Sequence, residues 1–231
     1  MPYRKKYNKK YPRNYRKKYG RKHKYQKGTK AVIIRGPSAL PDRIRVKLVY
    51  CDILNQAGAA SAIFQYVGND LFDPQLSAGG HQPYMFDQWA AMYARYRVYG
   101  SSLRAEIINE SGTAAAQVII YPASVPATTA DKIIEAAEMP RAGMTHIIPV
   151  ASRYPIHLKR YVSTRAIAGL KKGVVSTDDS YSAAVTTGPS NKWYWNIVSE
   201  SIDSTTNLDL WITVKLVFYA EFYEAQVQAQ S

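Results

Sequence analysis

Tyrosine recurs at every fourth position from Tyr3 to Tyr19 in a basic N-terminal stretch, YRKKYNKKYPRNYRKKYGRKHKY, which covers residues 3–25. Lysine and arginine side chains bind phosphate oxygens without reading base sequence. A tyrosine ring stacks on the face of an unpaired base, and this contact contributes about 1–3 kcal/mol whatever the base. Because a duplex hides these faces, the interleaved pattern indicates binding to single-stranded nucleic acid of arbitrary sequence.

Charge is distributed unevenly along the chain. Residues 1–35 hold 15 of the 31 Lys and Arg residues and no acid, so 16 bases and 17 acids remain in residues 36–231. The net charge of +14 therefore lies in the first 35 residues, and the rest of the chain is close to neutral. This asymmetry is typical of a polyanion-binding arm joined to an ordinary folded domain. We expect residues 1–35 to be disordered until nucleic acid binds, and residues 36–231 to fold.

Other interpretations of the arm stay open. A basic run is also typical of a nuclear localisation signal, and the two roles are compatible. A helical face would explain the spacing of four, but Pro12 and Gly20 interrupt it. Attraction to a membrane surface is a further alternative, although the arm lacks the Leu and Phe that an interfacial helix buries.

The remainder of the chain has the pattern of a β protein. Alternating apolar and polar residues predict half-buried strands. The longest alternation is LDLWITVKLVFYAEF, in which seven apolar residues from Leu208 to Ala220 fall on one face. Further strands are predicted at 42–53, 62–67, 98–109, 114–121, 156–162 and 193–198.

Helical patterns are scarce. Phe86, Trp89, Tyr93 and Tyr96 form a stripe at helical spacing in residues 85–96. A second short helix is predicted at 131–139. Many short strands with long Gly, Ser, Thr and Pro-rich loops predict an all-β fold, a single eight-stranded jelly-roll β-sandwich with two short helices in its loops.

Two local patterns in the body have a structural and a functional interpretation. Arg43, Arg45 and Lys47 lie on one face of the first predicted strand, where they would extend the basic surface beyond the arm. An ordinary solvated strand face is the equal alternative. Trp193 and Trp195 share a strand face and are predicted to pack in the sandwich or at a subunit contact.

No pattern of residues indicates catalysis. The four histidines do not stand at metal-ligand spacing, and no nucleophile elbow or phosphate-binding loop is present. Asp178 and Asp179 are adjacent acids of the kind that bind calcium, but such pairs in a Ser/Thr-rich loop are usually solvated. The single cysteine, Cys51, cannot form an internal disulfide. We expect no catalytic residue, no metal, no cofactor and no membrane insertion, since no apolar run reaches roughly 20 residues.

Two segments resemble a known family. PYMFDQWAAMYARYRVYGSSLRAEIINES (residues 83–111) is similar to a stretch in the capsid proteins of circovirus-like eukaryotic viruses with circular single-stranded DNA genomes, which also encode a replication initiator. VKLVFYAEF (residues 214–222) resembles the last strand of such shells. The basic arm followed by a neutral β body fits the same group. Coat proteins of satellite plant viruses have a similar architecture with an RNA cargo.

The resemblance implies a single jelly roll that self-assembles into a small icosahedral shell of sixty copies, with its arm facing inward onto a single-stranded DNA genome. It also implies nuclear import by host machinery, with the protein in the virion and, during assembly, in the host nucleus. Carried onto this sequence, it assigns genome contact to Arg4, Lys5, Lys6, Lys9, Lys10, Arg13, Arg16, Lys17, Lys18, Arg21, Lys22 and Lys24. The stacking argument adds Tyr7, Tyr11, Tyr15 and Tyr19, and the first strand adds Arg43, Arg45 and Lys47.

Two other classes of function compete with a shell protein. One is a non-capsid protein that binds single-stranded DNA or RNA through its β domain. Such a module should gather basic and aromatic residues on one face, whereas the body is nearly neutral and we expect its charges to be scattered. The other is an enzyme with a basic targeting arm, for which no catalytic constellation is present.

Overall fold

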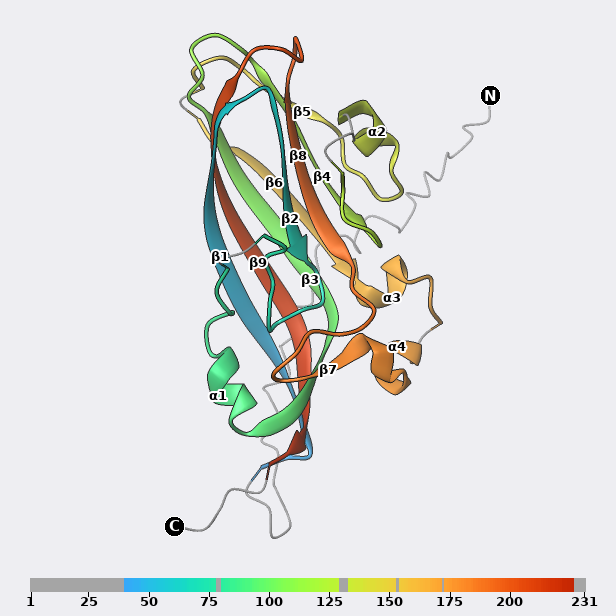
Figure 1. Ribbon diagram of the computed structural model, residues 1–231. Helices are drawn as coiled ribbons and strands as arrows, with labels where there is room; N and C mark the ends of the chain where they lie inside the picture. Colours follow the sequence, from blue (N-terminus) through green and yellow to red (C-terminus); the bar gives the residue numbers. More distant parts are fainter. Residues whose placement is uncertain (1–39, 78–79, 129–132, 153, 172, 227–231) are drawn as a thin grey trace, which may run out of the picture. The chain divides into compact units, whose positions relative to one another are not determined.

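The computed structural model describes residues 40–226 except 78–79, 129–132, 153 and 172. These residues form two antiparallel sheets packed face to face (Figure 1). The first sheet has the strand order β1-β9-β3-β6, with the short β7 also paired to β3, and the second has the order β2-β8-β4-β5. The strands are β1 (Arg43–Ala59), β2 (Ser61–Val67), β3 (Tyr93–Asn109), β4 (Ala116–Ala123), β5 (His146–Ile148), β6 (Ile156–Ser163), β7 (Ser182–Ala184), β8 (Tyr194–Ser201) and β9 (Leu208–Ala225). The helices are α1 (Phe86–Ala90), α2 (Ile133–Glu138), α3 (Thr164–Ile167), α4 (Val174–Thr177) and the 3₁₀ turn η1 (Asp179–Tyr181).

The strand pairing is nested. β1 pairs with β9, β2 with β8, β3 with β6, and β4 with β5. Four antiparallel pairs folded into two facing sheets in this way make a jelly roll. The predicted fold class is therefore confirmed, and seven of the predicted strands correspond to β1, β2, β3, β4, β6, β8 and β9.

The core lies between the sheets and follows the predicted alternation. All seven apolar residues from Leu208 to Ala220 are buried on the inner face of β9, which runs between β1 and β3. Trp193 and Trp195 are also buried, with their ring centroids 5.4 Å apart. The indole N–H of Trp195 donates to the hydroxyl of Ser101 at 2.9 Å, and that of Trp193 donates to Thr164 at 3.2 Å. The predicted packing of both tryptophans inside the sandwich is confirmed.

The helix predicted at 85–96 is mostly wrong. α1 ends at Ala90, and Tyr93 and Tyr96 belong to β3, where they pair with β9. The aromatic stripe is real, but it converges on Phe222, whose ring lies 6.1–6.4 Å from those of Phe86, Trp89, Tyr93 and Tyr96. Helical spacing arose because a single helical turn leads directly into a strand that packs on the same core.

The two sheets differ in what lies on their outer faces. α2, within the second predicted helix, packs beside β4 and buries Ile133 and Ala136 against Ile119, Tyr121 and Val198 (Figure 1). The outer face of the first sheet is instead open to solvent along β1, where Arg43, Arg45 and Lys47 are exposed. The short elements β5, β7, α3 and α4 were not predicted, because each has at most four residues and no resolvable period.

Candidate nucleic-acid interface

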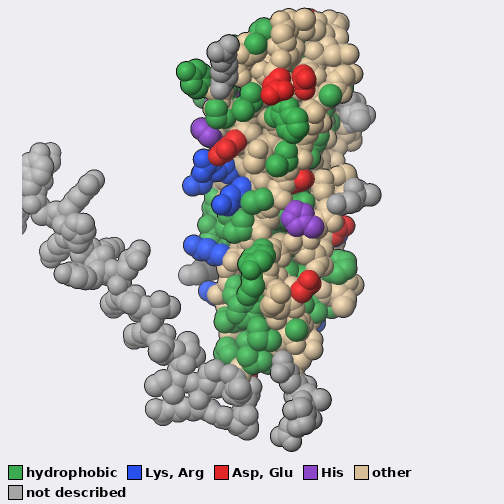
Figure 2. Space-filling view, turned by 90° about the vertical axis from the view of Figure 1, so that its left-hand side faces the viewer, with side chains coloured by type: hydrophobic (Ala, Val, Ile, Leu, Met, Phe, Trp, Pro, Cys, Tyr) green, Lys and Arg blue, Asp and Glu red, His purple; other side chains and the backbone are tan. Residues whose placement is uncertain are grey.

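Basic side chains gather on the outer face of the first sheet. The strand register aligns residues of neighbouring strands in rows across this face. One row contains Arg43, Tyr223 and Arg95, and the next contains Arg45, Glu221 and Arg97. We call the eight Lys and Arg residues on this face the basic face: Arg43, Arg45, Lys47, Arg95, Arg97, Arg104, Lys159 and Lys215. They are half of the 16 Lys and Arg residues in residues 36–231, and most of the Lys and Arg side chains visible in Figure 2 line one edge of the body.

The expectation of scattered charge was therefore wrong. The near-neutral composition of the body does not reveal this cluster of cations, because the residues on one face of the sheet come from strands that are far apart in the sequence. Only three acids on these four strands share the face, namely Glu106, Asp209 and Glu221. The resulting surplus of positive charge attracts a polyanion to this side of the sandwich.

A hollow of about 300 Å³ opens on the basic face. It is lined by Arg45, Val46, Lys47, Tyr99, Tyr219 and Ala220. The Arg45 guanidinium lies 5.0 Å from the Tyr99 ring centroid, and the Lys47 ammonium lies 5.3 Å from that of Tyr219. Two cations and two rings around one depression are the components that bind a nucleotide, because the cations meet phosphate and the rings offer stacking surfaces.

Glu221 holds the hollow in shape. Its side chain is 5% exposed; Arg45 donates to one carboxylate oxygen at 3.0 Å and Tyr99 to the other at 2.7 Å. Burial alone would raise the pKa of Glu221, but the hydrogen bonds from Tyr99 and Arg45 and the charges of Arg45 and Arg43 outweigh it and lower that pKa. Burial and the bond to Glu221 raise the pKa of Tyr99, so its hydroxyl remains a donor. Glu221 thus fixes a cation and a ring side by side.

Aromatic surface continues from the hollow across the sheet. The ring of Tyr219 meets that of Tyr161 edge to face, with centroids 5.5 Å apart, and Tyr161 is exposed. Tyr223 lies in the row next to that of Arg45 and Glu221. Its ring centroid is 5.9 Å from the guanidinium carbon of Arg95 and 5.2 Å from that of Arg97. Tyrosine and basic residues therefore alternate on this surface as they do in the N-terminal arm, although here the order is created by strand pairing.

The predicted contact residues divide into two groups. Arg43, Arg45 and Lys47 lie together on the solvent side of β1, as expected, and their role in binding nucleic acid stays a prediction. The predicted residues between Arg4 and Lys24, tyrosines included, lie outside the described residues. Sequence reasoning missed Arg95, Arg97, Tyr99, Tyr219 and Tyr223. The alternation of Arg95 and Arg97 around Tyr96 was a signal, but the predicted helix at 85–96 included Arg95 and Tyr96 and ended before Arg97.

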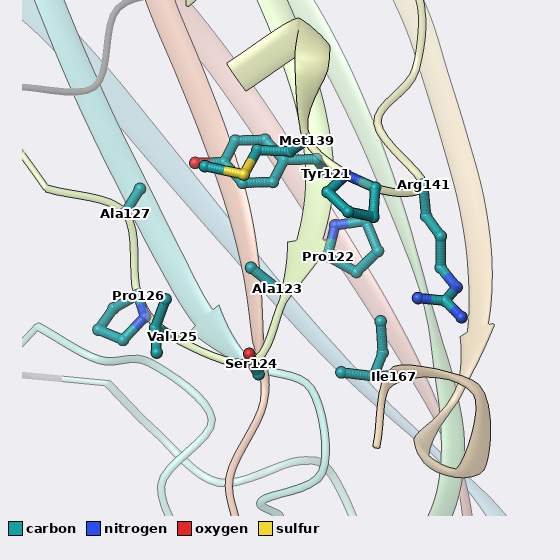
Figure 3. Close-up of a pocket in the computed structure, with 11 residues that line it drawn as sticks. Tyr121, Pro122, Ala123, Ser124, Val125, Pro126, Ala127, Met139, Arg141 and Ile167 are labelled. Atoms are coloured by element: carbon teal, nitrogen blue, oxygen red, sulfur yellow. The ribbon is translucent and has the colours of Figure 1, made fainter. Parts of the chain in front are cut away.

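A second hollow, of about 250 Å³, has a different character. It lies between the loop after β4 and the end of α2, and Figure 3 shows Val125, Pro126, Met139 and Ile167 around it. Among the described residues that line it, Arg141 is the one charged side chain. Such a lining offers no acid–base pair and suits an apolar side chain of another molecule.

The acidic residues of the body are spread over separate sites. In the part of the chain that the structure describes, no group of three or more His, Cys, Asp or Glu residues is placed to hold a metal ion. Asp178 accepts from the backbone and hydroxyl of Ser180, and Asp179 faces Arg95 and Arg97. The two acids therefore have different partners, Ser180 for Asp178 and the two arginines for Asp179. No helix in the described residues has the length and apolar character to cross a membrane.

Comparison with known proteins gave structural similarities alone. No protein-family model and no curated protein matches the sequence. The fold is similar to a solved structure of Desmodium yellow mottle tymovirus, with 13% identity over 88% of this chain and 99% of that one and a TM-score of 0.43. It is also similar to the BFDV capsid protein in a decameric form (15% identity, 79% and 99% coverage, TM-score 0.41) and in a 60-mer (12%, 82% and 97%, 0.43). The jelly-roll assignment follows from the strand order of this chain and does not depend on these similarities.

Proposed function

We propose that this protein is a viral capsid protein that self-assembles into a small icosahedral shell and packages single-stranded nucleic acid through its basic arm. The observation that carries the proposal is that a strongly basic arm is followed in the sequence by a jelly-roll body with a basic face. The arm, residues 1–35, is followed within a few residues by β1, whose exposed side carries the first three cations of the basic face. A subunit so built has one side for a polyanion and leaves its edges for neighbouring subunits.

Exposed apolar side chains supply surface for contacts between subunits. Ile134, Met144, Ile147 and Tyr154 are all more than 60% exposed and come from the segment that follows β4. Val125 and Met139, also exposed, line the hollow of Figure 3 in the same segment. Several hundred Å² of exposed apolar surface is the size at which such patches mark interaction sites. Assembly would remove these side chains from water.

The charge of the arm suits packaging. Sixty arms with 15 positive charges each supply about 900 charges, a large share of those on a single strand of kilobase length. We propose single-stranded DNA as the cargo, as the resemblance implies, and nuclear import through the same arm. A small RNA virus coat is the alternative within this class, and digestion of packaged nucleic acid with DNase or RNase separates the two.

Electron microscopy of the purified protein, combined with its 260/280 nm absorbance ratio, tests the proposal. We expect uniform round particles both from the full chain and from a chain lacking residues 1–35, with nucleic-acid absorbance in the full chain alone. Protein that stays monomeric over a broad range of salt and pH, with and without nucleic acid, contradicts the capsid role.

The basic face favours a second candidate, a non-capsid single-strand-binding protein. Cations and tyrosines around one hollow are what a binding module presents to unpaired bases. This candidate predicts small oligomers that bind single strands with strong salt dependence but form no particles. The same microscopy experiment therefore decides between the two.

A further inference from the structure

Two arginines of β3 converge on one exposed carboxylate at the edge of the basic face. A terminal nitrogen of Arg95 and one of Arg97 each lie 3.7 Å from the same oxygen of Asp179. The side chain of Arg97 is 5% exposed and that of Arg95 is 30% exposed, whereas Asp179 is 75% exposed. Both distances exceed that of a hydrogen bond, so Asp179 balances the two charges without forming a bidentate pair.

The two guanidinium groups keep unused donors. Arg97 donates to the carbonyl of Ser176 at 2.7 Å and to the hydroxyl of Tyr223 at 3.5 Å, and Arg95 donates to the hydroxyl of Ser182 at 2.8 Å. The Nε atoms of Arg95 and Arg97 are buried and have no hydrogen-bond partner among the residues that the structure describes. A guanidinium has five N–H donors and is most stable when a planar or tetrahedral anion accepts from several of them. The site thus holds more donor capacity than the protein's own acceptors use.

An aromatic ring borders the same group. Tyr223 of β9 packs against Arg97 and Arg95, and register places it between Arg95 and Arg43. A ring beside three cations is the arrangement that accepts a base next to its own phosphate. The sandwich therefore presents an anion position and a stacking position side by side.

We propose that Arg95 and Arg97 form a binding site for one phosphodiester group of single-stranded nucleic acid, and that Asp179 is the internal counter-ion that the phosphate displaces. This rests on the proposed function, which it extends from the arm to a defined point on the folded body. A phosphate offers more acceptor oxygens than a carboxylate and meets two guanidinium forks at once. Displacing Asp179 costs little because its carboxylate is mostly solvated, lies beyond hydrogen-bond distance from both arginines, and accepts only a long bond of 3.5 Å from the Ser182 hydroxyl among the described residues.

The test is photo-crosslinking of the full-length protein to a short single-stranded oligonucleotide that contains 5-iododeoxyuridine, with peptide mass spectrometry to locate the crosslinks. We expect crosslinks at Tyr223 in the wild type. Arg95→Gln should reduce the Tyr223 crosslink roughly tenfold, the loss expected when a charged hydrogen-bond donor to phosphate is removed. Asp179→Asn should increase it about two- to fivefold, because the competing charge is gone.

Two variants control for net charge. Arg165→Gln removes an exposed positive charge on α3, outside the basic face. Glu106→Gln removes one charge from an exposed ion pair with Arg104 whose atoms are 2.8 Å apart. Neither should change the Tyr223 crosslink more than about twofold, since single exposed charges contribute little. Arg97 itself is not substituted because it is buried, and its loss would perturb folding.

Three results would overturn the site. They are no crosslink at Tyr223 in the wild type, equal losses in Arg95→Gln and Arg165→Gln, or a decrease in Asp179→Asn. Failure here is distinct from failure of the proposed function. If arm tyrosines crosslink and particles form while Tyr223 stays unmodified, this site alone is refuted. If no residue crosslinks at all, nucleic-acid packaging is refuted as well.

Discussion

Glu221 is the residue whose charge arranges the hollow on the basic face, and Glu221→Gln tests that role. The substitution keeps the shape of the side chain and removes its charge. Tyr99 then donates to a neutral amide oxygen in place of a carboxylate oxygen at 2.7 Å. Hydrogen bonds to charged groups contribute about 1.5–3 kcal/mol and neutral ones about half as much, so this change costs about 1–1.5 kcal/mol. Arg45 is 74% exposed, so the loss of its ion pair with Glu221 costs about 0.2–1 kcal/mol more.

We therefore expect Glu221→Gln to lower the free energy of unfolding by about 1–2.5 kcal/mol near neutral pH. Urea unfolding followed by tryptophan fluorescence measures this, because Trp193 and Trp195 are buried in the core. Glu106→Gln is the matched control. It removes a carboxylate from the same sheet, but one whose partner Arg104 is half exposed, and it should change the free energy by less than about 0.5 kcal/mol.

The pH dependence gives a second check. Folding lowers the pKa of Glu221, so its ionised form stabilises the wild type fully above the ordinary carboxyl pKa of about 4.3. The contribution is lost as pH falls through the lower pKa of the folded state. The stability difference between wild type and Glu221→Gln should stay constant in mildly acidic solution and shrink at lower pH. A difference that grows on acidification, or one below about 0.5 kcal/mol at neutral pH, would refute the reasoning.

Three further predictions concern the body. Ser101→Ala should lower the free energy of unfolding by about 2–4 kcal/mol in urea titrations, because it leaves the buried Trp195 N–H and Gly68 carbonyl without the hydroxyl that joins them at 2.9 and 2.7 Å. Gly68→Ala should cost about 1–3 kcal/mol in thermal or urea unfolding, since its new Cβ would lie 2.4 Å from ring atoms of Trp193, whereas Gly112→Ala meets nothing within 4 Å and should be close to neutral. Asp203, in the turn between β8 and β9, accepts from Ser201, Thr205 and Thr206, and these bonds lower its pKa. Its carboxyl carbon should titrate by NMR well below the ordinary aspartate pKa of about 3.9, and a midpoint at or above that value would contradict the assigned bonds.

Strands with a clear period of two were predictable from sequence because each has one buried and one solvated face. β9 is the strongest case, and its alternation persists without a break from Leu208 to Ala220. The region around α1 was harder. Phe86, Trp89, Tyr93 and Tyr96 have helical spacing, yet the last two belong to a strand, because hydrogen bonds to β9 override the local pattern.

The candidate interface was only partly predictable. Arg43, Arg45 and Lys47 share a face within one strand, so alternation alone places them together. Their neighbours Tyr99, Tyr219 and Glu221 come from strands about 50 and 175 residues further along the chain, and only the register of β1, β9 and β3 brings them into one hollow. Pairing of this range depends on the whole fold, and no local pattern in the sequence encodes it.

The nested strand order also has a consequence for synthesis. β9, the strand furthest along the described chain, is the one that joins β1 to β3, and residues such as Lys47 and Tyr219 meet across more than 170 positions. Contacts of such long range make folding slow, and the first sheet stays divided until β9 has left the ribosome. The basic arm emerges long before that moment. Under the proposed function, nucleic acid could therefore reach the arm while the body is still incomplete and before any contact between shell subunits forms.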